Sequence, residues 1–261
     1  RLARLLMRFL ILTDIHGNLE ALDAVLESAQ PASFDRVLVL GDLVGYGANP
    51  NEVIDRIFDL NPAVMIRGNH DRVASGLGST ETFNGLAADA IRWTRKVLTT
   101  ANRTRLAELQ RGPVAVNTEI EVCHGTPFDE DHYHTNERDA ILSLQASKHQ
   151  ICLFGHTHLP VALEHNGENL RIATPDFGGK TAKTTSQHRI EIIPGLRYLL
   201  NPGSVGQPRD GDSRAAYATL DSEAENQFVF KRVTYPISAA QQKILNAGLP
   251  EPLATRLTVG H

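Results

Sequence analysis

Side chains that bind metal ions occur in five short clusters along the chain, and each cluster contains or adjoins a glycine. The clusters are Asp14-Ile15-His16, Gly41-Asp42, Gly68-Asn69-His70-Asp71, His124-Gly125 and Gly155-His156-Thr157-His158. Glycine lets the backbone turn sharply, which brings side chains from separate segments to one point. One such cluster alone would be an ordinary turn. Five unrelated turns would not all be expected to carry metal-binding residue types. The five clusters together therefore predict a shared metal site.

Seven side chains in these clusters have suitable ligand atoms, which is too many for a single ion. They are Asp14, His16, Asp42, Asn69, His124, His156 and His158. The set suits two divalent ions about 3.5–4 Å apart that share one ligand. Asp42 is the natural bridge, because a carboxylate offers two oxygens. Nitrogen and oxygen ligands without thiolate favour Mn, which we expect first, with Fe, Zn, Ni, Co or Mg as alternatives.

Each cluster directly follows a short apolar run that predicts a buried strand. These runs cover residues 9–12, 37–40, 63–66, 120–123 and 151–154. Helical patterns at residues 19–29, 51–60 and 137–148 lie between the strands, and a longer one covers residues 82–110. In such α/β arrangements, ligands bind at the carboxyl ends of the strands. The predicted metal ligands all stand at such ends.

After Pro160 the pattern changes to alternating apolar runs, which predict a second, mostly antiparallel sheet over residues 161–233. Within it, the polar, Thr-rich residues 174–188 predict a loop or long hairpin that could act as a lid. No linker separates the sheets. We therefore expect an α/β fold, a two-sheet β-sandwich flanked by helices. It would form a single domain over residues 8–250, between a frayed extension (residues 1–7) and a tail (residues 251–261).

Composition and charge argue against several other classes of protein. The chain of 261 residues has a net charge of -4 and a pI near 6.3, whereas a nucleic-acid-binding surface usually shows a basic excess. No apolar run approaches the length of a membrane span. Cys123 and Cys152 suit buried, reduced thiols. We expect a cytoplasmic protein without membrane or nucleic-acid partners, and the sequence leaves its oligomeric state open.

Taken together, the five clusters resemble the five-block signature of the calcineurin-like metallophosphoesterases, with every block present and in order. The resemblance spans about residues 8–233 and implies a four-layer β-sandwich with flanking helices. It implies one ion on Asp14, His16, Asp42 and His158, and another on Asp42, Asn69, His124 and His156. It also implies a small phosphorylated substrate, attacked by a hydroxide that bridges the ions. His70 would assist as a non-ligand, so His70 and Asn69 are the predicted catalytic residues.

The chain departs from the serine/threonine protein phosphatases of this superfamily. Gly45 stands where those enzymes have the Asp that orients the catalytic histidine, and Tyr46 stands where they have a phosphate-binding Arg. Residues 41–52 and 201–209 instead look like the bacterial YfcE-like and diadenosine-tetraphosphatase-like phosphodiesterases. Arg209 and Arg67 are candidates for binding a substrate phosphate, although both could equally serve the local structure.

The leading hypothesis is a metal-dependent hydrolase that cleaves phosphodiester or phosphoanhydride bonds of a small molecule or nucleotide, with a dinucleoside polyphosphate as one candidate. A phosphomonoesterase acting on small metabolites is an alternative that the sequence does not separate from it. A protein-binding scaffold with a degenerate metal site is a third, but no ligand is missing from this chain. The substrate itself depends on loops, which sequence patterns describe poorly.

Overall fold

The computed structural model describes residues 7–30, 34–179, 185–221 and 226–261, which contain two six-stranded mixed sheets. In the first sheet the strand order is β3 (Val64–Met65), β2 (Arg36–Val39), β1 (Arg8–Leu12), β11 (Ala215–Asp221), β12 (Gln227–Val233) and β9 (Ser186–Glu191). In the second sheet it is β4 (Val114–Ala115), β5 (Ile120–Val122), β6 (Ile151–Leu153), β10 (Arg197–Asn201), β7 (Val161–His165) and β8 (Leu170–Ala173).

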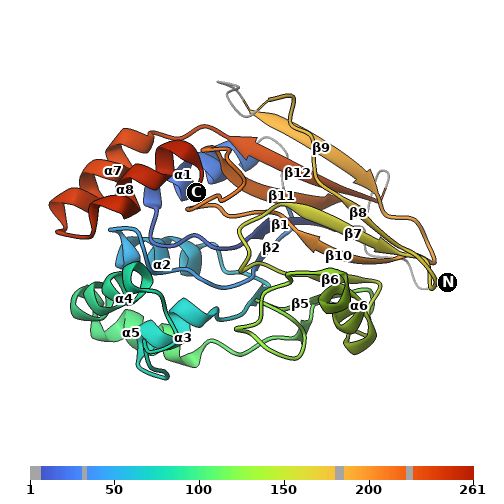
Figure 1. Cartoon of the computed structure of the whole chain (residues 1–261), viewed down its shortest axis with the longest axis horizontal. Coiled ribbons are helices and arrows are strands. Elements are labelled where there is room, and N and C mark those ends of the chain that lie inside the picture. The colour runs from blue at the N-terminus through green and yellow to red at the C-terminus, as the bar shows by residue number, and fades with distance from the viewer. Residues whose placement is uncertain (1–6, 31–33, 180–184, 222–225) are drawn as a thin grey trace.

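Helices cover the outer faces of the two sheets. Within the described residues they are α1 (Leu19–Ala29), α2 (Pro50–Asp59), α3 (Asn69–Ser75), α4 (Gly85–Val97), α5 (Thr100–Glu108), α6 (Glu137–Ala146), α7 (Ile237–Asn246) and α8 (Glu251–Val259). Figure 1 shows α7 and α8 packed together on one side of the molecule and α6 on the opposite side. The order helix, sheet, sheet, helix confirms the predicted α/β sandwich with flanking helices.

Strand β1 lies between two cores, and its residues alternate between them. Leu10 and Leu12 pack under helices that include α1, α2 and α7, whereas Phe9 and Ile11 pack against the second sheet. All four are buried. A strand covered on both faces needs a continuous apolar run, and this run predicted β1 from the sequence. A third core joins α6 to the second sheet and contains the buried free thiols that were expected.

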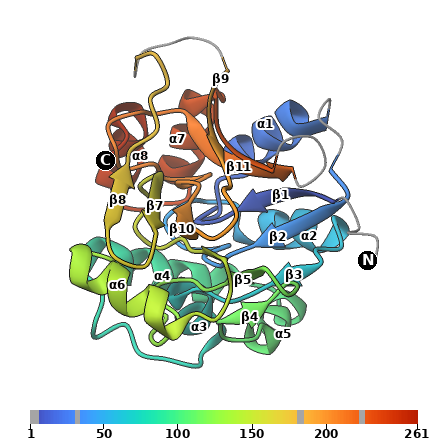
Figure 2. The same ribbon diagram turned by 90° about the vertical axis from the view of Figure 1, so that its right-hand side faces the viewer.

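Parallel pairing brings the predicted ligands to one end of the strands in each sheet. Strands β1, β2 and β3 are mutually parallel, and so are β5, β6 and β10. The five clusters follow the carboxyl ends of these strands. In Figure 2, helices α3 and α5 lie below β2 and β3.

Two expectations about the middle of the chain were wrong. Residues 161–233 do not form a separate sheet, because β9, β11 and β12 join the first sheet and β7, β8 and β10 join the second. Apolar alternation identifies a strand but not its partner. The helix expected over residues 82–110 is two helices, since Leu98 is extended and the Thr99 side chain caps α5 by accepting a hydrogen bond from the N–H of Asn102.

Strand β9 begins at Ser186, inside the segment expected to be a loop over residues 174–188. Residues 180–184 of that segment lie outside the described residues, as do residues 1–6 of the expected N-terminal extension. Among the helices that the structure describes, none combines the length and apolar character needed to cross a membrane.

The segment expected as a tail, residues 251–261, contains helix α8. Leu253 and Leu257 of this helix are buried in the same core as Leu10 of β1. Pro252 in the first turn interrupted the apolar pattern in the sequence, although proline is well tolerated at that position of a helix. The C-terminal helix therefore belongs to the packed structure, while the exact domain boundaries stay a prediction.

Replacing Leu253 by Ala should destabilise the protein by about 2–4 kcal/mol, because the side chain is fully buried and its removal leaves a cavity. The matched control is Val259→Ala at the end of the same helix, where the side chain is 52% exposed. Urea unfolding followed by circular dichroism measures both changes. Equal stabilities of the two variants would show that α8 is not part of the core.

Candidate metal centre

Two groups of buried side chains meet at the carboxyl ends of the parallel strands. The first group comprises Asp14, His16, Asp42 and His158. The second comprises Asp42, His124 and His156. In each group the possible ligand atoms all lie within 4.8 Å of one another. Asp42 belongs to both groups, which is the position expected of a bridging carboxylate. The structure thus gathers six of the seven predicted ligands, and Asn69 is considered below.

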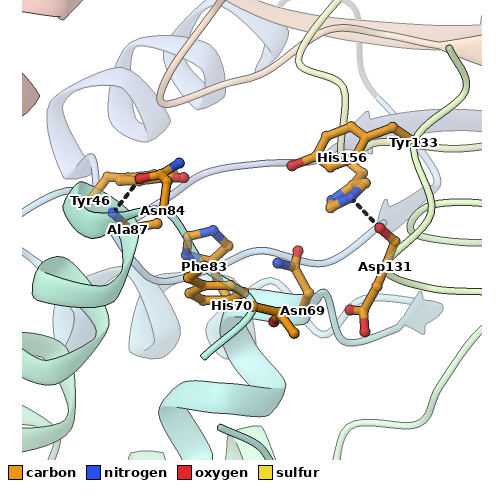
Figure 3. Close-up of a pocket in the computed structure, with 10 residues that line it drawn as sticks. Tyr46, Asn69, His70, Phe83, Asn84, Ala87, Asp131, Tyr133 and His156 are labelled. Carbon is orange, nitrogen blue, oxygen red and sulfur yellow. Dashed lines mark hydrogen bonds between the residues drawn. The ribbon is translucent and has the colours of Figure 1, made fainter. Parts of the chain in front are cut away.

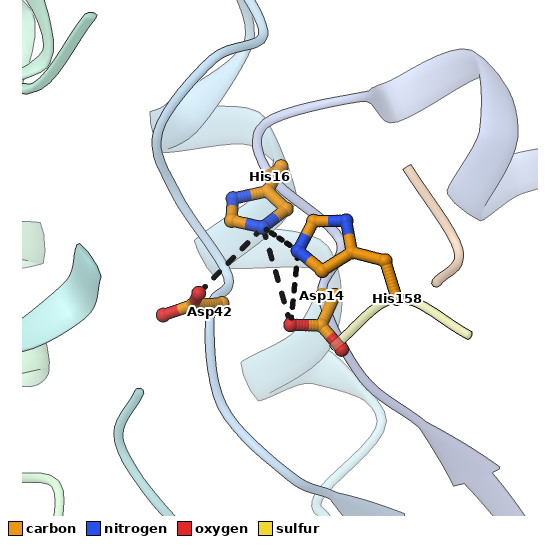
Figure 4. A group of neighbouring side chains, drawn as sticks. All are labelled: Asp14, His16, Asp42 and His158. Carbon is orange, nitrogen blue, oxygen red and sulfur yellow. Dashed lines mark hydrogen bonds and ion pairs between the residues drawn. The ribbon is translucent and has the colours of Figure 1, made fainter. Parts of the chain in front are cut away.

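Lone pairs converge on one point in the first group (Figure 4). His16 Nε2 lies 3.1 Å from His158 Nε2 and 3.6 Å from Asp42 Oδ2. His158 Nε2 lies 3.5 Å from Asp14 Oδ1. Lone pairs of neutral imidazoles and carboxylates repel at such distances unless a proton or a cation lies between them. The donor set of nitrogen and oxygen atoms therefore fits a divalent metal ion.

A backbone carbonyl orients each of the four imidazole rings. The pairs are His16 Nδ1 with Val44 O (3.0 Å), His124 Nδ1 with Leu40 O (2.7 Å), His158 Nδ1 with Gln207 O (2.6 Å) and His156 Nε2 with Asp131 O (3.1 Å). A carbonyl can only accept, so each of these ring nitrogens carries the proton and donates. In His16, His124 and His158 the opposite nitrogen, Nε2, lies 3.3–3.6 Å from a carboxylate oxygen of Asp14 or Asp42. Such hydrogen bonds fix the tautomer and direction of metal-binding histidines in other proteins.

Burial and mutual charge set the protonation of the site. Burial lowers the pKa of His16 and His158 well below the usual value, and that of His156 to about 3, so these rings are neutral at pH 7, as metal binding requires. Burial also lowers the pKa of His124, but the Asp42 carboxylate outweighs it and raises that pKa to about 10. His124 and Asp42 therefore form a buried ion pair, with 3.3 Å between Nε2 and Oδ2.

The backbone is left-handed at five of the predicted ligands. The φ angles are 52° at Asp14, 51° at His16, 55° at Asp42, 65° at His156 and 61° at His158. Residues other than glycine avoid this conformation, at a cost of about 1–2 kcal/mol each, and such strain collects at functional sites. Hydrogen bonds between loops offset it. The Asp14 N–H donates to Gly41 O (3.0 Å), and the His16 N–H donates to Asp42 O (2.9 Å).

Asn69 completes the predicted ligand set. Its side chain is 6% exposed, and its Oδ1 is buried without a hydrogen-bond partner in the part of the chain that the structure describes. A buried, unpaired oxygen costs about 1–3 kcal/mol, which a bound cation would recover. Gly68 packs directly on Asp42, and a Cβ at this glycine would overlap the carboxylate. Glycine at this position therefore lets the start of α3, which carries Asn69, pack directly against Asp42.

Aromatic rings orient His70, which answers a question that the sequence left open. The His70 ring stacks on Phe83 (4.8 Å between centroids) and contacts Tyr46 at 4.7 Å and His16 at 4.8 Å. Its Nδ1 is buried beside Gly45, where a Cβ would overlap it. Phe83 was not identified from the sequence, because a lone aromatic at the start of a helical stretch carries no sign of a partner.

The contact between Arg67 and the loop around Glu130 was also missed. Arg67 donates two hydrogen bonds to Glu130, each 3.1 Å long. The next residues of this loop reach the site: Asp131 O orients His156, and the Tyr133 ring stacks on His156 with 3.8 Å between centroids. The structure thus gives Arg67 a carboxylate partner, and its role in binding substrate stays a prediction. Only the acidic character of residues 129–131 hinted at this contact.

A pocket of about 370 Å³ opens beside the second group (Figure 3). Its lining residues are Tyr46, Asn69, His70, Thr82, Phe83, Asn84, Ala87, Asp131, Tyr133 and His156. The pocket therefore touches predicted metal ligands and the predicted catalytic histidine, and its volume is at the small end for ligand sites. A small phosphoester fits these dimensions.

Comparison with known proteins identifies the family. A model of the calcineurin-like phosphoesterase superfamily domain matches residues 7–225. The chain belongs to the calcineurin-like phosphoesterase superfamily. The members of this superfamily are metal-dependent phosphoric ester hydrolases, so the family predicted from the five clusters is confirmed.

Three similar proteins illustrate the match. The uncharacterised protein MJ0912 of Methanocaldococcus jannaschii is 34% identical over 255 residues, which cover 96% of this chain and 97% of that protein. The crystal structure of a metallophosphoesterase from Sphaerobacter thermophilus has 36% identity and a TM-score of 0.84, and covers 98% of this chain and 100% of its own. Phosphodiesterase YfcE of Escherichia coli is 24% identical over 227 residues, 84% of this chain and 89% of YfcE.

Mn²⁺ affinity should rise between about pH 6 and pH 8. The ion must displace the proton that Asp42 holds on His124, whose pKa is about 10. One displaced proton changes the apparent dissociation constant by up to about tenfold per pH unit. Isothermal titration calorimetry in two buffers of different ionisation enthalpy measures both the affinity and the protons released. A pH-independent affinity without proton release would contradict this expectation.

Gly45→Ala should lower kcat by at least about tenfold, because the added methyl displaces the His70 ring from its aromatic contacts. Gly76→Ala is the control: that glycine also has a positive φ, but a Cβ there would meet nothing within 4 Å. Steady-state kinetics with a chromogenic phosphodiester, together with Mn²⁺ affinity, separates loss of catalysis from loss of metal. Equal kcat values for the two variants would mean that Gly45 does not position His70.

Proposed function

We propose that this chain is a dinuclear phosphoesterase that cleaves phosphodiester or phosphoanhydride bonds of a small molecule or nucleotide. The orientation of the four imidazoles carries the proposal: each ring binds a backbone carbonyl with one nitrogen, and His16, His124 and His158 turn the other toward buried carboxylates. The relative YfcE is named a phosphodiesterase, which supports cleavage of phosphodiester bonds. The complete ligand set argues against a scaffold that has lost its metal.

In this proposal the chain supplies two sets of ligands. One ion would be held by Asp14, His16, Asp42 and His158, and the other by Asp42, Asn69, His124 and His156. Two divalent ions at this position supply Lewis acidity to a phosphoryl group and lower the pKa of water. Manganese is the ion that we propose first, on the chemistry of the donor set. A cytoplasmic location is likewise our proposal from the sequence.

His70 would donate a hydrogen bond to the oxygen on which charge develops. Burial lowers its pKa to about 4, so the ring is neutral at pH 7 and carries one N–H proton. Its backbone N–H donates to Asp42 Oδ1 (2.9 Å), which ties the position of the ring to the shared carboxylate. Asn69, the preceding residue, would act as a ligand and hold the start of helix α3 in place.

Arg209 is the stronger of the two candidates for binding substrate phosphate. Its Nη2 donates to Gln207 Oε1 (2.9 Å) and lies 3.4 Å from the Tyr46 hydroxyl, so the guanidinium is held beside the site by neutral groups. Arg67 is bound to Glu130. We propose that Arg67 acts chiefly by holding the Glu130 loop over the site.

Metal-loaded protein should hydrolyse bis-p-nitrophenyl phosphate, and Asp42→Ala should lower this activity at least about a hundredfold by removing the shared ligand. Asp23→Ala, on the surface of α1, is the matched control and should keep full activity. Release of p-nitrophenol and the metal content of each variant are measured together. Activity that persists both after chelation of the metal and in the Asp42→Ala variant would contradict the proposed function.

A further inference from the structure

Two guanidinium groups from distant parts of the chain lie beside the candidate metal centre. Arg209 follows strand β10, and Arg256 lies in the last turn of helix α8. Both guanidinium carbons face the Tyr46 ring, at 5.7 Å and 5.9 Å from its centroid. The same ring contacts His16 and His70, with 4.7 Å between centroids in each case. The two cations are thus one aromatic ring away from the reacting groups.

Neither cation pairs with an acidic side chain. Within residues 7–30, 34–179, 185–221 and 226–261, no Asp or Glu forms an ion pair with Arg209 or Arg256, and Arg209 Nε is buried without a hydrogen-bond partner. The acids that follow Arg209 pair with other arginines: Asp210 with Arg232, and Asp212 with Arg214. Burial, together with the charge of Arg209, lowers the pKa of Arg256. Two half-buried like charges therefore stand close together with no acidic side chain between them, and a bound anion would reduce their repulsion.

Backbone contacts hold the two arginines in this arrangement. The Gly211 N–H donates to Gly260 O (2.9 Å), which joins the loop of Arg209 to the end of α8. Arg256 Nε donates to His261 O (2.5 Å), so this guanidinium is anchored through its inner nitrogen. Its outer nitrogens stay available to a ligand. Rigid placement lowers the entropy cost of binding an anion.

We propose that Arg209 and Arg256 form a subsite for a second phosphate group of the substrate. This inference rests on the proposed function, which places the first phosphate at the metal centre. A planar guanidinium binds two phosphate oxygens through parallel hydrogen bonds, so a pair of them selects a phosphate over a neutral group. We therefore expect substrates that are small molecules with at least two neighbouring phosphates, such as a nucleoside or dinucleoside polyphosphate. Simple diesters lack the second phosphate that this subsite would bind.

The test compares binding of inorganic phosphate and inorganic triphosphate to the Mn²⁺-loaded protein, by calorimetry at a fixed concentration of free Mn²⁺, with ³¹P NMR after each titration to verify that the triphosphate is intact. The wild-type chain should prefer triphosphate, and Arg256→Gln should reduce that preference about five- to tenfold. Arg138→Gln, which removes an exposed arginine of α6, is the charge-matched control and should keep the wild-type preference. Melting temperatures verify that both variants are folded.

A wild-type protein without preference for triphosphate, or a preference that Arg256→Gln leaves intact, overturns the subsite. If Arg256→Gln does not fold, Arg256→Lys serves in its place, because it keeps the charge but loses the planar fork, and it should show a smaller loss. Failure of the proposed function is a separate result, since it would appear as absent hydrolysis of bis-p-nitrophenyl phosphate. The ratio of the two binding constants reports on the subsite alone.

Discussion

The burial of two carboxylates among imidazole rings is the constraint on which the rest of the structure depends. Asp14 and Asp42 are at most 1% exposed, and their side-chain ion pairs are with histidines rather than with Lys or Arg. Burying charge costs several kcal/mol per group unless it is compensated, and burial accordingly raises the pKa of Asp14 to about 7. Cations at this position would compensate the charge. Until they bind, the surrounding framework must hold groups that repel one another.

That framework consists of the apolar layers on either side of β1 and β2. Because both faces of these strands are packed, the loops that follow them cannot relax away from each other. The left-handed backbone at Asp14, His16 and Asp42 is tolerated because the loops hydrogen-bond to one another at 2.8–3.0 Å. The packed strands hold the loops in place, and the loops hold the predicted ligands in their strained conformations. The stability of the sheets therefore offsets the strain at these residues.

The sequence predicted the features that depend on local residue patterns and missed those that depend on contacts between distant segments of the chain. The strand ends and the residues that gather there were predictable, since a doubly covered strand needs a continuous apolar run and parallel strands end at the same edge. The partners of β11 and β12 were not, because pairing depends on contacts across the whole chain. Helix α8 was missed for the same reason. Its apolar residues are few, and their burial depends on α7 and the first sheet.

Tyr46 stands where the serine/threonine protein phosphatases have a phosphate-binding Arg, and its contacts show the physical consequence of this replacement. With Gly45 in place of an acid, no carboxylate of the described residues binds the His70 ring at Nδ1, and aromatic rings take over that role. Tyr46 then contacts the His70 ring, and the guanidinium groups of Arg209 and Arg256 also lie near the Tyr46 ring. An anion bound between the arginines would press on the same ring that orients His70. In the proposed enzyme, substrate charge and the position of His70 would therefore be coupled through one side chain, which an Arg at this position would not provide.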